Sequence, residues 1–439
     1  MDLQVSTNAQ PSGRLDFIDA HRGFAVLLML WMHTADGWLR PELKHGASWD
    51  LIRALGGLAA PTFLLLSGLG LALGWNVTTA AAALPVQAAG AQRSEVARGL
   101  QLIVLGYALR LQMWMLDAAG YSLAEGWAAA VPLAAAFAAA YLGLDAWARG
   151  LRTARWLGLI AALGACVGYG LVAAFIPERF APLLRVDVLQ AIGASLVVLA
   201  AVREPLQRRP ELSLWLAAAA ALATPAARAS MPGPLPPAFA GYIAQWETLP
   251  GQPLPTLFPL FPWISYALVG AWVGLRLGEK QRREGGGARF AVRLAAVATV
   301  LVLVACEPLP TARFLRAHWP WLAPLLRVGY RVGAALLLGG LAVLVAHPRT
   351  PLRGMPIALG RASLVIYWVH LQFAFGSAAK PIIRTLDFDG WAVGLGVLTV
   401  AMTMLASTWV RFRTRLRRAA RKQAERAVGA ENPSALTRA

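Results

Sequence analysis

The sequence predicts an all-α integral membrane protein, a polytopic helix bundle with about 11–12 transmembrane helices. Composition is the first reason: of 439 residues, 58% are hydrophobic and only 14% are charged, which is too apolar for a soluble enzyme of this length. The second reason is that the apolar residues form runs close to the roughly 20 residues that cross a bilayer. The third is that short basic segments separate these runs, a pattern that reports topology and argues against a nucleic-acid partner despite the net charge of +19.

Twelve apolar runs are candidate transmembrane helices. The fourth and fifth are the clearest, whereas the sixth and seventh are short, so the count falls to 11 if one of them is re-entrant. In chain order the runs cover residues 18–38, 52–75, 99–116, 124–147, 155–176, 187–202, 211–228, 259–277, 290–306, 324–346, 358–378 and 389–410.

The segments outside these runs differ in composition. Residues 1–13 are polar and lack a cleavable signal pattern, so we expect a disordered cytoplasmic N-terminus followed by a membrane domain over residues 14–411. The proline-rich segment 229–258 cannot be helical throughout; it is either a lid or acceptor platform over a site, or a stiff connector. Residues 412–439 form a basic cytoplasmic tail, which we expect to lie against anionic membrane lipid.

Lys and Arg are distributed unequally between alternate loops. One set of loops, counted with the C-terminal tail, holds 26 of them and the other set holds 9. Because cytoplasmic loops are the ones enriched in Lys and Arg, we expect both termini inside the cell. The connection between the first two helices then faces outward, and the expected location is the inner, cytoplasmic membrane of a bacterial-type cell.

This first connection holds the most informative polar residues. His33 and Asp36 end the first helix and His45 follows 12 residues after His33, so both imidazoles can approach one external pocket. A neutral imidazole can take a proton from an amine or hydroxyl, or accept an acyl group directly. Asp36, at i+3 from His33, can fix its tautomer. The structural alternatives are a solvated loop histidine at position 45 and a hydrated helix end at position 33.

Other polar residues lie within or at the ends of predicted helices, where such groups usually face a bundle interior or a cavity. Asp187 and Gln190 share one face at the start of the sixth helix, and His370 lies in the middle of the eleventh. Asp19 and Arg22 open the first helix, where we expect a salt bridge that fixes the position of the helix.

Three arginines also lie within or at the ends of predicted helices: Arg110 inside the third, and Arg327 and Arg331 one turn apart in the tenth. A guanidinium can hold a phosphate through paired hydrogen bonds. It can equally neutralise an acidic residue such as Asp187. The sequence leaves both roles open.

Several motifs of other enzyme classes are missing from the sequence. We find no Walker A, GxSxG, GxGxxG or HExxH pattern and no CxxC pair, which argues against ATP hydrolysis, serine-hydrolase chemistry and a bound metal. The main alternative hypothesis is a secondary transporter of a sugar or anionic solute, since many transporters also have twelve helices with both termini inside the cell. Against it, the two halves show no corresponding pair of broken helices.

The motifs in their order along the chain resemble the catalytic region of the heparan-alpha-glucosaminide N-acetyltransferase family and its bacterial relatives. The pattern R-x4-D-x2-RG starts at Arg14 and precedes an apolar helix that ends in histidine; H-x2-SW and APTFLLLSG follow. Further similar segments are RVDVLQAIG, the Pro-Trp helix FPLFPWISYALVGAWVG and the penultimate helix LGRASLVIYWVHLQF.

The resemblance implies a transferase that moves an acetyl or short acyl group from cytosolic acyl-CoA to an amino-sugar or glycan acceptor outside. The family's catalytic histidine stands in a KHASW-like segment, which reads KHGASW here, so the role carries to His45 as general base or acyl-carrying nucleophile. The animal member of the family has asparagine where this chain has His33.

The remaining site residues take their roles from this function. His33 and Asp36 would assist His45, and the arginines at positions 110, 327 and 331 would contact the phosphates of acetyl-CoA. The substrate pocket would include Ser48, Trp49, Asp187, Gln190, Trp263 and His370. The expected partners are acyl-CoA, a carbohydrate acceptor and membrane lipids, with a homodimer left open.

Overall fold

The computed structural model describes residues 15–81, 85–116, 123–175, 180–231, 235, 237–245, 256–282, 286–306 and 309–431. Within these ranges helices account for the fold, and the β-structure consists of two isolated bridges. The predicted all-α class is confirmed. The predicted N-terminal segment 1–13, part of the proline-rich segment and the last residues of the basic tail lie outside the described residues.

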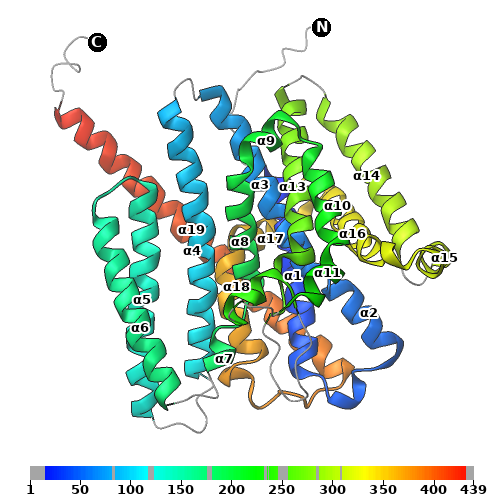
Figure 1. The fold of residues 1–439 in the computed structure, drawn as a ribbon, viewed down its shortest axis with the longest axis horizontal. Coiled ribbons are helices and arrows are strands. Elements are labelled where there is room, and N and C mark those ends of the chain that lie inside the picture. The colour runs from blue at the N-terminus through cyan, green and yellow to red at the C-terminus, as the bar shows by residue number, and fades with distance from the viewer. Residues whose placement is uncertain are drawn as a thin grey trace.

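Each of the twelve predicted apolar runs is helical in the structure (Figure 1). The helices of the first half are α1 (Asp16–Trp38), α2 (Gly46–Gly56), α3 (Ala59–Ala81), α4 (Pro85–Leu116), α5 (Leu123–Ala148), α6 (Thr153–Phe175), α7 (Phe180–Leu183), α8 (Val188–Ala201), α9 (Arg203–Arg208) and α10 (Leu212–Leu222). Those of the second half are α11 (Thr224–Ala229), α12 (Pro237–Ile243), α13 (Leu260–Arg282), α14 (Gly286–Ala305), α15 (Pro310–His318), α16 (Ala323–Val345), α17 (Gly354–Arg361), α18 (Ser363–Ala374) and α19 (Phe388–Glu431).

Not every predicted run is a complete membrane span by length and composition. Among the described residues, six helices are long and apolar enough to cross a membrane, or up to eight if each of two bent helix pairs forms one span. The sixth and seventh runs became α8 and α10, which have 14 and 11 residues and are shorter than the roughly 20 that a span requires. This measure therefore finds fewer spans than the 11–12 expected.

Two helix pairs are bent, which we did not expect from the sequence. α14 and α15 meet at 64°, and the segment Pro351–Arg361, which contains α17, meets α18 at 82°. Both pairs lie in the second half of the chain. They therefore do not form the corresponding pair, one in each half, that marks the binding site of many transporters.

α1 runs through the middle of the bundle and contacts α2, α3, α16, α17, α18 and α19. Figure 1 shows the α5–α6 hairpin beside α4 on one side of this centre, and α14 with α15 on the other. Helices that lie at opposite ends of the sequence thus meet around α1.

Two glycines allow α1 and α17 to approach each other closely. A Cβ atom at Gly23 would lie 2.0 Å from the carbonyl oxygen of Pro356, and one at Gly360 would lie 1.8 Å from that of Asp19. Such distances exclude any side chain, so backbone packs directly on backbone, as is typical where small residues line a helix interface in a membrane protein. The contact fixes α17 against the first turns of α1.

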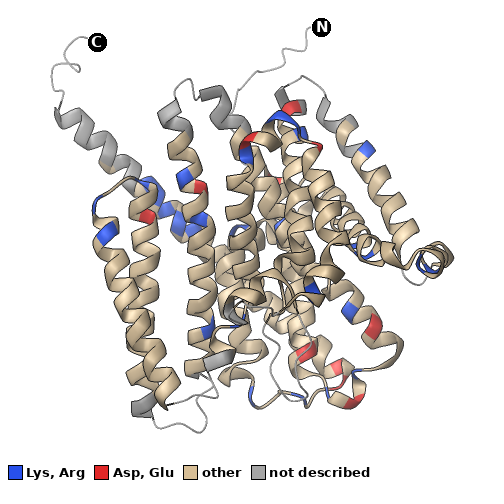
Figure 2. Cartoon of the chain, viewed as in Figure 1, with Lys and Arg blue, Asp and Glu red and all other residues tan. Residues whose placement is uncertain are grey.

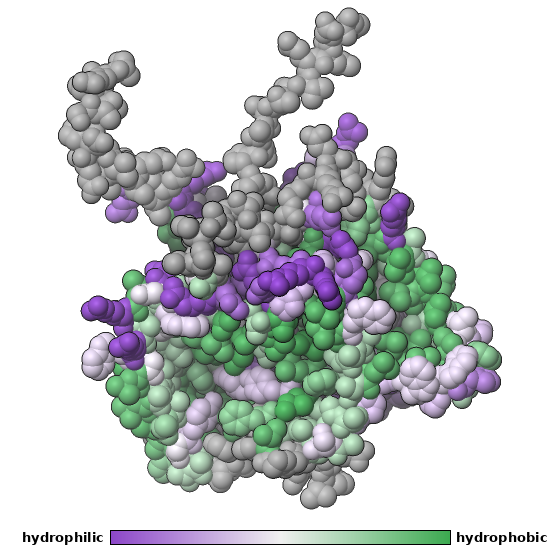
Figure 3. Space-filling view, turned by 45° about the horizontal axis from the view of Figure 1, so that its top comes forward, coloured by the Kyte–Doolittle hydropathy of each residue, from purple (hydrophilic) through white to green (hydrophobic). Residues whose placement is uncertain are grey.

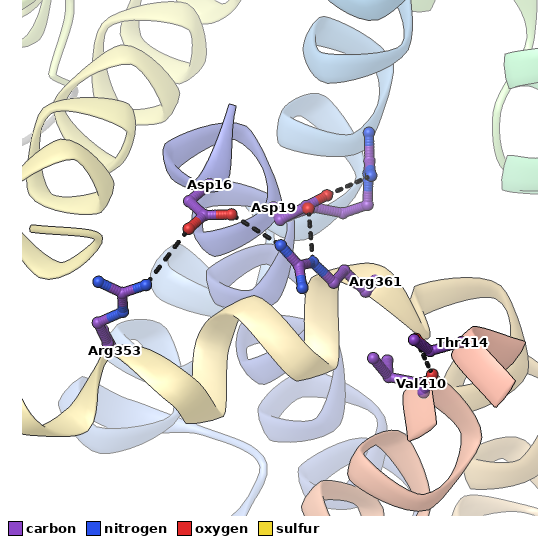
Figure 4. Close-up of polar contacts among 7 residues, drawn as sticks. Asp16, Asp19, Arg353, Arg361, Val410 and Thr414 are labelled. Atoms are coloured by element: carbon purple, nitrogen blue, oxygen red, sulfur yellow. Dashed lines mark hydrogen bonds and ion pairs between the residues drawn. The ribbon is translucent and has the colours of Figure 1, made fainter. Parts of the chain in front are cut away.

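An ion-pair cluster reinforces this contact (Figure 4). Arg361 of α17 reaches both acidic residues of α1: its Nη2 lies 2.7 Å from Asp16 Oδ1 and its Nε lies 3.0 Å from Asp19 Oδ2. Arg353 adds a second contact to Asp16 at 3.5 Å, and Arg22 pairs with Asp19 at 3.4 Å. The salt bridge predicted between Asp19 and Arg22 is confirmed, and the cluster joins the two ends of the chain.

The surface has the polarity expected of a membrane bundle. Large apolar side chains are exposed on the outer helices, among them Trp156 and Leu163 of α6 at 71% and 66%. Figure 3 shows a broad hydrophobic surface bordered by hydrophilic residues. Figure 2 shows Lys and Arg gathered toward one end of the bundle, on α4, α9, α19 and the α5–α6 connection.

α19 continues without a break through the predicted domain boundary at residue 411. It spans 44 residues from Phe388 to Glu431, and its basic residues from Arg411 to Arg418 are exposed. The basic tail therefore begins as the direct extension of an apolar helix, so its first arginines emerge where that helix leaves the apolar surface.

Candidate functional site

A cavity of about 190 Å³ lies where α1 meets α3, α8, α13, α16 and α18. α1 presents Met29, Met32 and His33 to it, residues spaced so that they share one face of a helix. Asp187, Arg331 and Tyr367 supply the other polar groups, while the remaining lining includes Phe63, Phe258 and Trp263. The cavity is thus largely apolar with a few convergent polar groups, as small-molecule sites usually are.

His33 forms a hydrogen bond with His370 inside the bundle. The Nδ1 atom of His33 lies 2.8 Å from Nε2 of His370, across 337 residues of sequence. The two ring planes differ by only 5°, with centroids 5.1 Å apart, so the bond lies in the plane of both imidazoles. His370 is fully buried and Tyr367, one turn earlier on α18, packs against its ring.

The second nitrogen of His370 determines where the protons sit. Its Nδ1 lies 2.8 Å from the carbonyl oxygen of Ile366, which can only accept, so Nδ1 carries the proton. In the neutral ring Nε2 is then an acceptor, and His33 Nδ1 must donate to it. The Nε2 atom of His33 therefore keeps its lone pair, on a side chain that lines the cavity.

Asp187 lines the same cavity but its charge is already compensated. Its Oδ2 accepts a hydrogen bond from Arg110 Nη2 of α4 at 2.8 Å. It also caps α8: its side chain accepts a hydrogen bond from the backbone N–H of Val188, and the backbone N–H of Asp187 donates to Gln190 Oε1 in a capping box. Of the two roles open for Arg110, the structure shows neutralisation of Asp187. Gln190 is fully buried and serves the cap.

Arg331 lies in the cavity in a different setting. Its guanidinium lies over the ring of Trp263, 5.8 Å from the centroid, and the Tyr266 hydroxyl lies close enough to interact with it. Among the described residues, no carboxylate forms an ion pair with Arg331. Arg327, one turn earlier on α16, is exposed and does not line this cavity.

The connection that carries His45 lies away from the cavity. His45 is exposed and precedes α2, whose far end, Gly56, lines the cavity. The 11 residues of α2 place His45 about 15 Å from that end at 1.5 Å per residue. The structure thus brings His33 and His370 together but leaves His45 apart from them.

The neighbours of His45 form a small cluster of their own. Lys44 pairs with the exposed Asp36 at 3.7 Å and also bonds its backbone carbonyl. The Lys44 ammonium lies 5.8 Å from the centroid of Trp49, which is buried, whereas Ser48 is exposed. Asp36 therefore pairs with Lys44, and its side chain makes no hydrogen bond to the His33 ring.

Described parts of the proline-rich segment pack beside the site. Thr256 forms an isolated bridge with Val186, and the backbone of Leu257 donates to the Val186 carbonyl, next to Asp187. Phe258 then lines the cavity, and Tyr242 of α12 shares a 2.8 Å hydrogen bond with Tyr107 of α4. The described parts of this segment thus pack beside the site, and its role as a lid, an acceptor platform or a stiff connector stays a prediction.

The sequence points to the charged and histidine side chains of this site but not to their pairing. His33, His370, Asp187, Arg331 and Trp263 were all candidates, yet nothing in one sequence shows that positions 33 and 370 touch. The sequence does not point to the other lining residues, among them Met29, Phe63 and Tyr367, because apolar and tyrosine side chains on membrane helices carry no distinguishing signal. Among the described residues, no group of three or more His, Cys, Asp and Glu side chains could hold a metal ion.

Comparisons with known proteins give the reaction class. Neither curated proteins nor solved structures match the chain. A family model described as heparan-alpha-glucosaminide N-acetyltransferase, catalytic, matches residues 14–304, which include α1 to α13 and every residue lining the cavity except Arg331 and Tyr367. Since the match covers well over half of the 439 residues, the chain belongs to this family of transmembrane acetyltransferases.

Proposed function

We propose that this protein transfers an acetyl or short acyl group from acyl-CoA to an amino-sugar or glycan acceptor. Family membership supplies the reaction class. The observation that carries the proposal is the His33–His370 hydrogen bond beside the cavity, because it leaves His33 with one free basic nitrogen in a defined direction. Acyl transfer to an amine or hydroxyl needs a base of this kind.

The reaction follows from the proton positions of the pair. As the acceptor nitrogen or oxygen bonds to the thioester carbon, His33 Nε2 takes its proton. The imidazolium that forms keeps its Nδ1–H bond to His370, which stabilises the charge away from water. When the carbon–sulfur bond breaks, His33 returns the proton to the sulfur and CoA leaves as the free thiol.

The size of the cavity suits the reacting groups alone. At about 190 Å³ it is smaller than the pockets of roughly 300–1,000 Å³ that bury drug-sized ligands. It therefore accommodates the acyl thioester and the attacking group of the acceptor, while the nucleotide end of CoA stays outside. Arg327, exposed on α16 one turn from Arg331, remains a candidate for contact with the CoA phosphates.

We place the donor on the cytoplasmic side of an inner membrane and the acceptor on the other. The gathering of Lys and Arg on α4, α9, α19 and the α5–α6 connection at one end of the bundle supports this orientation (Figure 2), since such residues favour the cytoplasmic side. α2, with His45 before it, projects from the opposite end of the bundle (Figure 1). An external sugar would then approach from the side of α2 and the proline-rich segment.

The family resemblance gives His45 the role of general base or acyl carrier, whereas the geometry favours His33. His45 is exposed, and its side chain is too short to reach the cavity from its position before α2. It could enter the cavity only if α2 moved. In our proposal His33 is the base of the transfer step. His45 would act either in a state with α2 closed over the cavity or as a ligand of the incoming sugar.

Transfer by purified protein in lipid nanodiscs tests this proposal, with labelled acetyl-CoA as donor, glucosamine as acceptor probe and free CoA as competitor. We expect saturable donor binding and label transfer that His33→Ala lowers by about 10²-fold or more. His45→Ala is the matched comparison. A loss with His45→Ala alone would move the base to His45, and no donor binding at millimolar concentration would contradict the acyltransferase function itself.

Solute transport is the second candidate, and the bent helix pairs favour it, because broken helices often form transport sites. Their position in one half of the chain counts against it. Counterflow of labelled sugar in liposomes without CoA separates the two functions, since only a transporter would exchange solute there.

A further inference from the structure

Arg331 is a cation in the cavity that forms no ion pair with any carboxylate of the described residues. The cavity lining includes two charged groups, Asp187 and Arg331, and Asp187 already pairs with Arg110 at 2.8 Å. Among the described residues, Arg331 interacts with the face of the Trp263 ring and with the nearby Tyr266 hydroxyl, and neither carries a negative charge. Two arginines and one aspartate thus give this region a net positive charge, and Asp187 compensates the charge of Arg110 rather than that of Arg331.

A charge in this position carries a free-energy cost that some ligand must offset. The cavity lining also includes the apolar side chains Phe63, Phe258 and Trp263, and α3, α13 and α16 pack against one another in the bundle. A charged side chain at membrane depth has a high free-energy cost unless it is paired or binds a ligand. Interaction with the Trp263 ring offsets only about 0.5–2 kcal/mol. A negative charge arriving in the cavity is the missing partner.

The CoA phosphates are a poor match for that partner. His33 and Arg331 line the same small cavity, so a donor whose thioester reaches His33 brings its carbonyl oxygen, not its diphosphate, to Arg331. The whole pantetheine arm separates the two ends of the donor. The negative charge that does form at this place is the oxygen of the tetrahedral intermediate.

We propose that Arg331 stabilises the oxyanion that forms when the acceptor attacks the thioester, an inference that rests on the acyltransferase function proposed above. The acceptor bonds to the carbonyl carbon, its proton passes to His33 Nε2, and the carbonyl π electrons move to oxygen, where the guanidinium donates hydrogen bonds. As the carbonyl re-forms, the carbon–sulfur bond breaks and the sulfur receives the proton from His33. Trp263 positions Arg331 by holding the guanidinium plane.

Steady-state kinetics of Arg331→Gln in nanodiscs, with acetyl-CoA and glucosamine and detection of released CoA, tests the proposal. Removing one oxyanion donor typically lowers kcat by about 10²–10³-fold. We expect that loss in kcat with the KM for acetyl-CoA and the Kd of free CoA unchanged within about twofold, because Arg331 contacts only a charge that develops during the reaction. Arg331→Lys keeps the cation and should recover at least tenfold of the loss.

The matched control is Arg313→Gln, the same exchange at an exposed position of α15 outside the cavity, which should leave both constants unchanged. A rise in KM and Kd with unchanged kcat in Arg331→Gln would overturn the proposal in favour of phosphate binding. Equal losses of kcat in Arg331→Lys and Arg331→Gln would overturn it too, because the positive charge would then have no effect on the rate. Donor binding by Arg331→Gln at the wild-type Kd shows that the variant folds. A wild-type protein that releases no CoA would overturn the acyltransferase function together with this inference, whereas full activity of Arg331→Gln overturns this inference alone.

Discussion

The two ends of α1 both bind the bent α17–α18 segment, but they do so in opposite ways. Near its start, Asp16 and Asp19 meet Arg361 of α17, and each charge has a counter-charge within 3.5 Å (Figure 4). Near its end, His33 meets His370 of α18 through one neutral hydrogen bond, and its second nitrogen remains free.

The difference separates structure from chemistry. In the ion-pair cluster the hydrogen-bonding and charge requirements are largely met within the protein, and backbone packs on backbone at Gly23 and Gly360. In such a contact every charged side chain has a partner of opposite charge, which holds the two helices together. At the other end a lone pair and an unpaired guanidinium border a cavity. Unsatisfied polar groups in a membrane interior are costly, which makes them markers of function.

The largest expected effect comes from removing the free nitrogen of His33 near the end of α1. His33→Gln keeps a polar side chain but removes the base, so we expect about a 10²–10⁴-fold lower kcat with unchanged unfolding temperature. Transfer assays and thermal unfolding of the same preparation check this. A lower unfolding temperature that accounts for the loss of activity would instead make the histidine pair a structural contact like the ion-pair cluster.

The opposite end should show the opposite response. Asp19→Ala leaves Arg361 without its nearly buried partner, and we expect a loss of about 3 kcal/mol or less in stability, since Arg361 keeps partial contact with water and with Asp16. Denaturant unfolding in detergent measures it. For the Asp19→Ala protein that remains folded, kcat should stay within about twofold of the wild-type value. A larger loss of kcat in a variant that still binds the donor normally would contradict the distinction between the two ends.

A smaller effect is expected from the partner of the base. His370→Ala removes the acceptor that fixes the His33 tautomer, so both tautomers become populated and kcat should fall about tenfold, with donor KM unchanged. His370→Gln can accept through its amide oxygen and should recover part of that loss. If the Ala variant equals wild type in its pH–rate profile as well as in kcat, His370 does not position His33.

The last prediction concerns the side of the membrane and involves no loss of activity. A cysteine introduced as Ser48→Cys, with the native Cys166 and Cys306 replaced by Ala, should react in intact cells with an impermeant thiol reagent. Protection in intact cells and labelling only after lysis would reverse the orientation of both ends of α1.

Sequence could predict the helices well because apolar runs of constant length directly reflect the bilayer. It failed at the lengths of α8 and α10 and at the bends, since these depend on how neighbouring helices pack. It could predict the polar members of the site, because ionisable residues stand out in apolar helices. It could not show that Arg110 belongs to Asp187 while Arg331 stays unpaired, because that depends on tertiary distances.

The 337 residues between His33 and His370 have a consequence for biosynthesis. A ribosome completes and inserts α1 first, and the base then has no partner until α18 enters the membrane near the end of translation. Chains released early, or held before Ser363, would retain the family-matched segment 14–304 yet lack the His33–His370 hydrogen bond. Any activity that depends on this bond would thus begin only when synthesis is nearly complete.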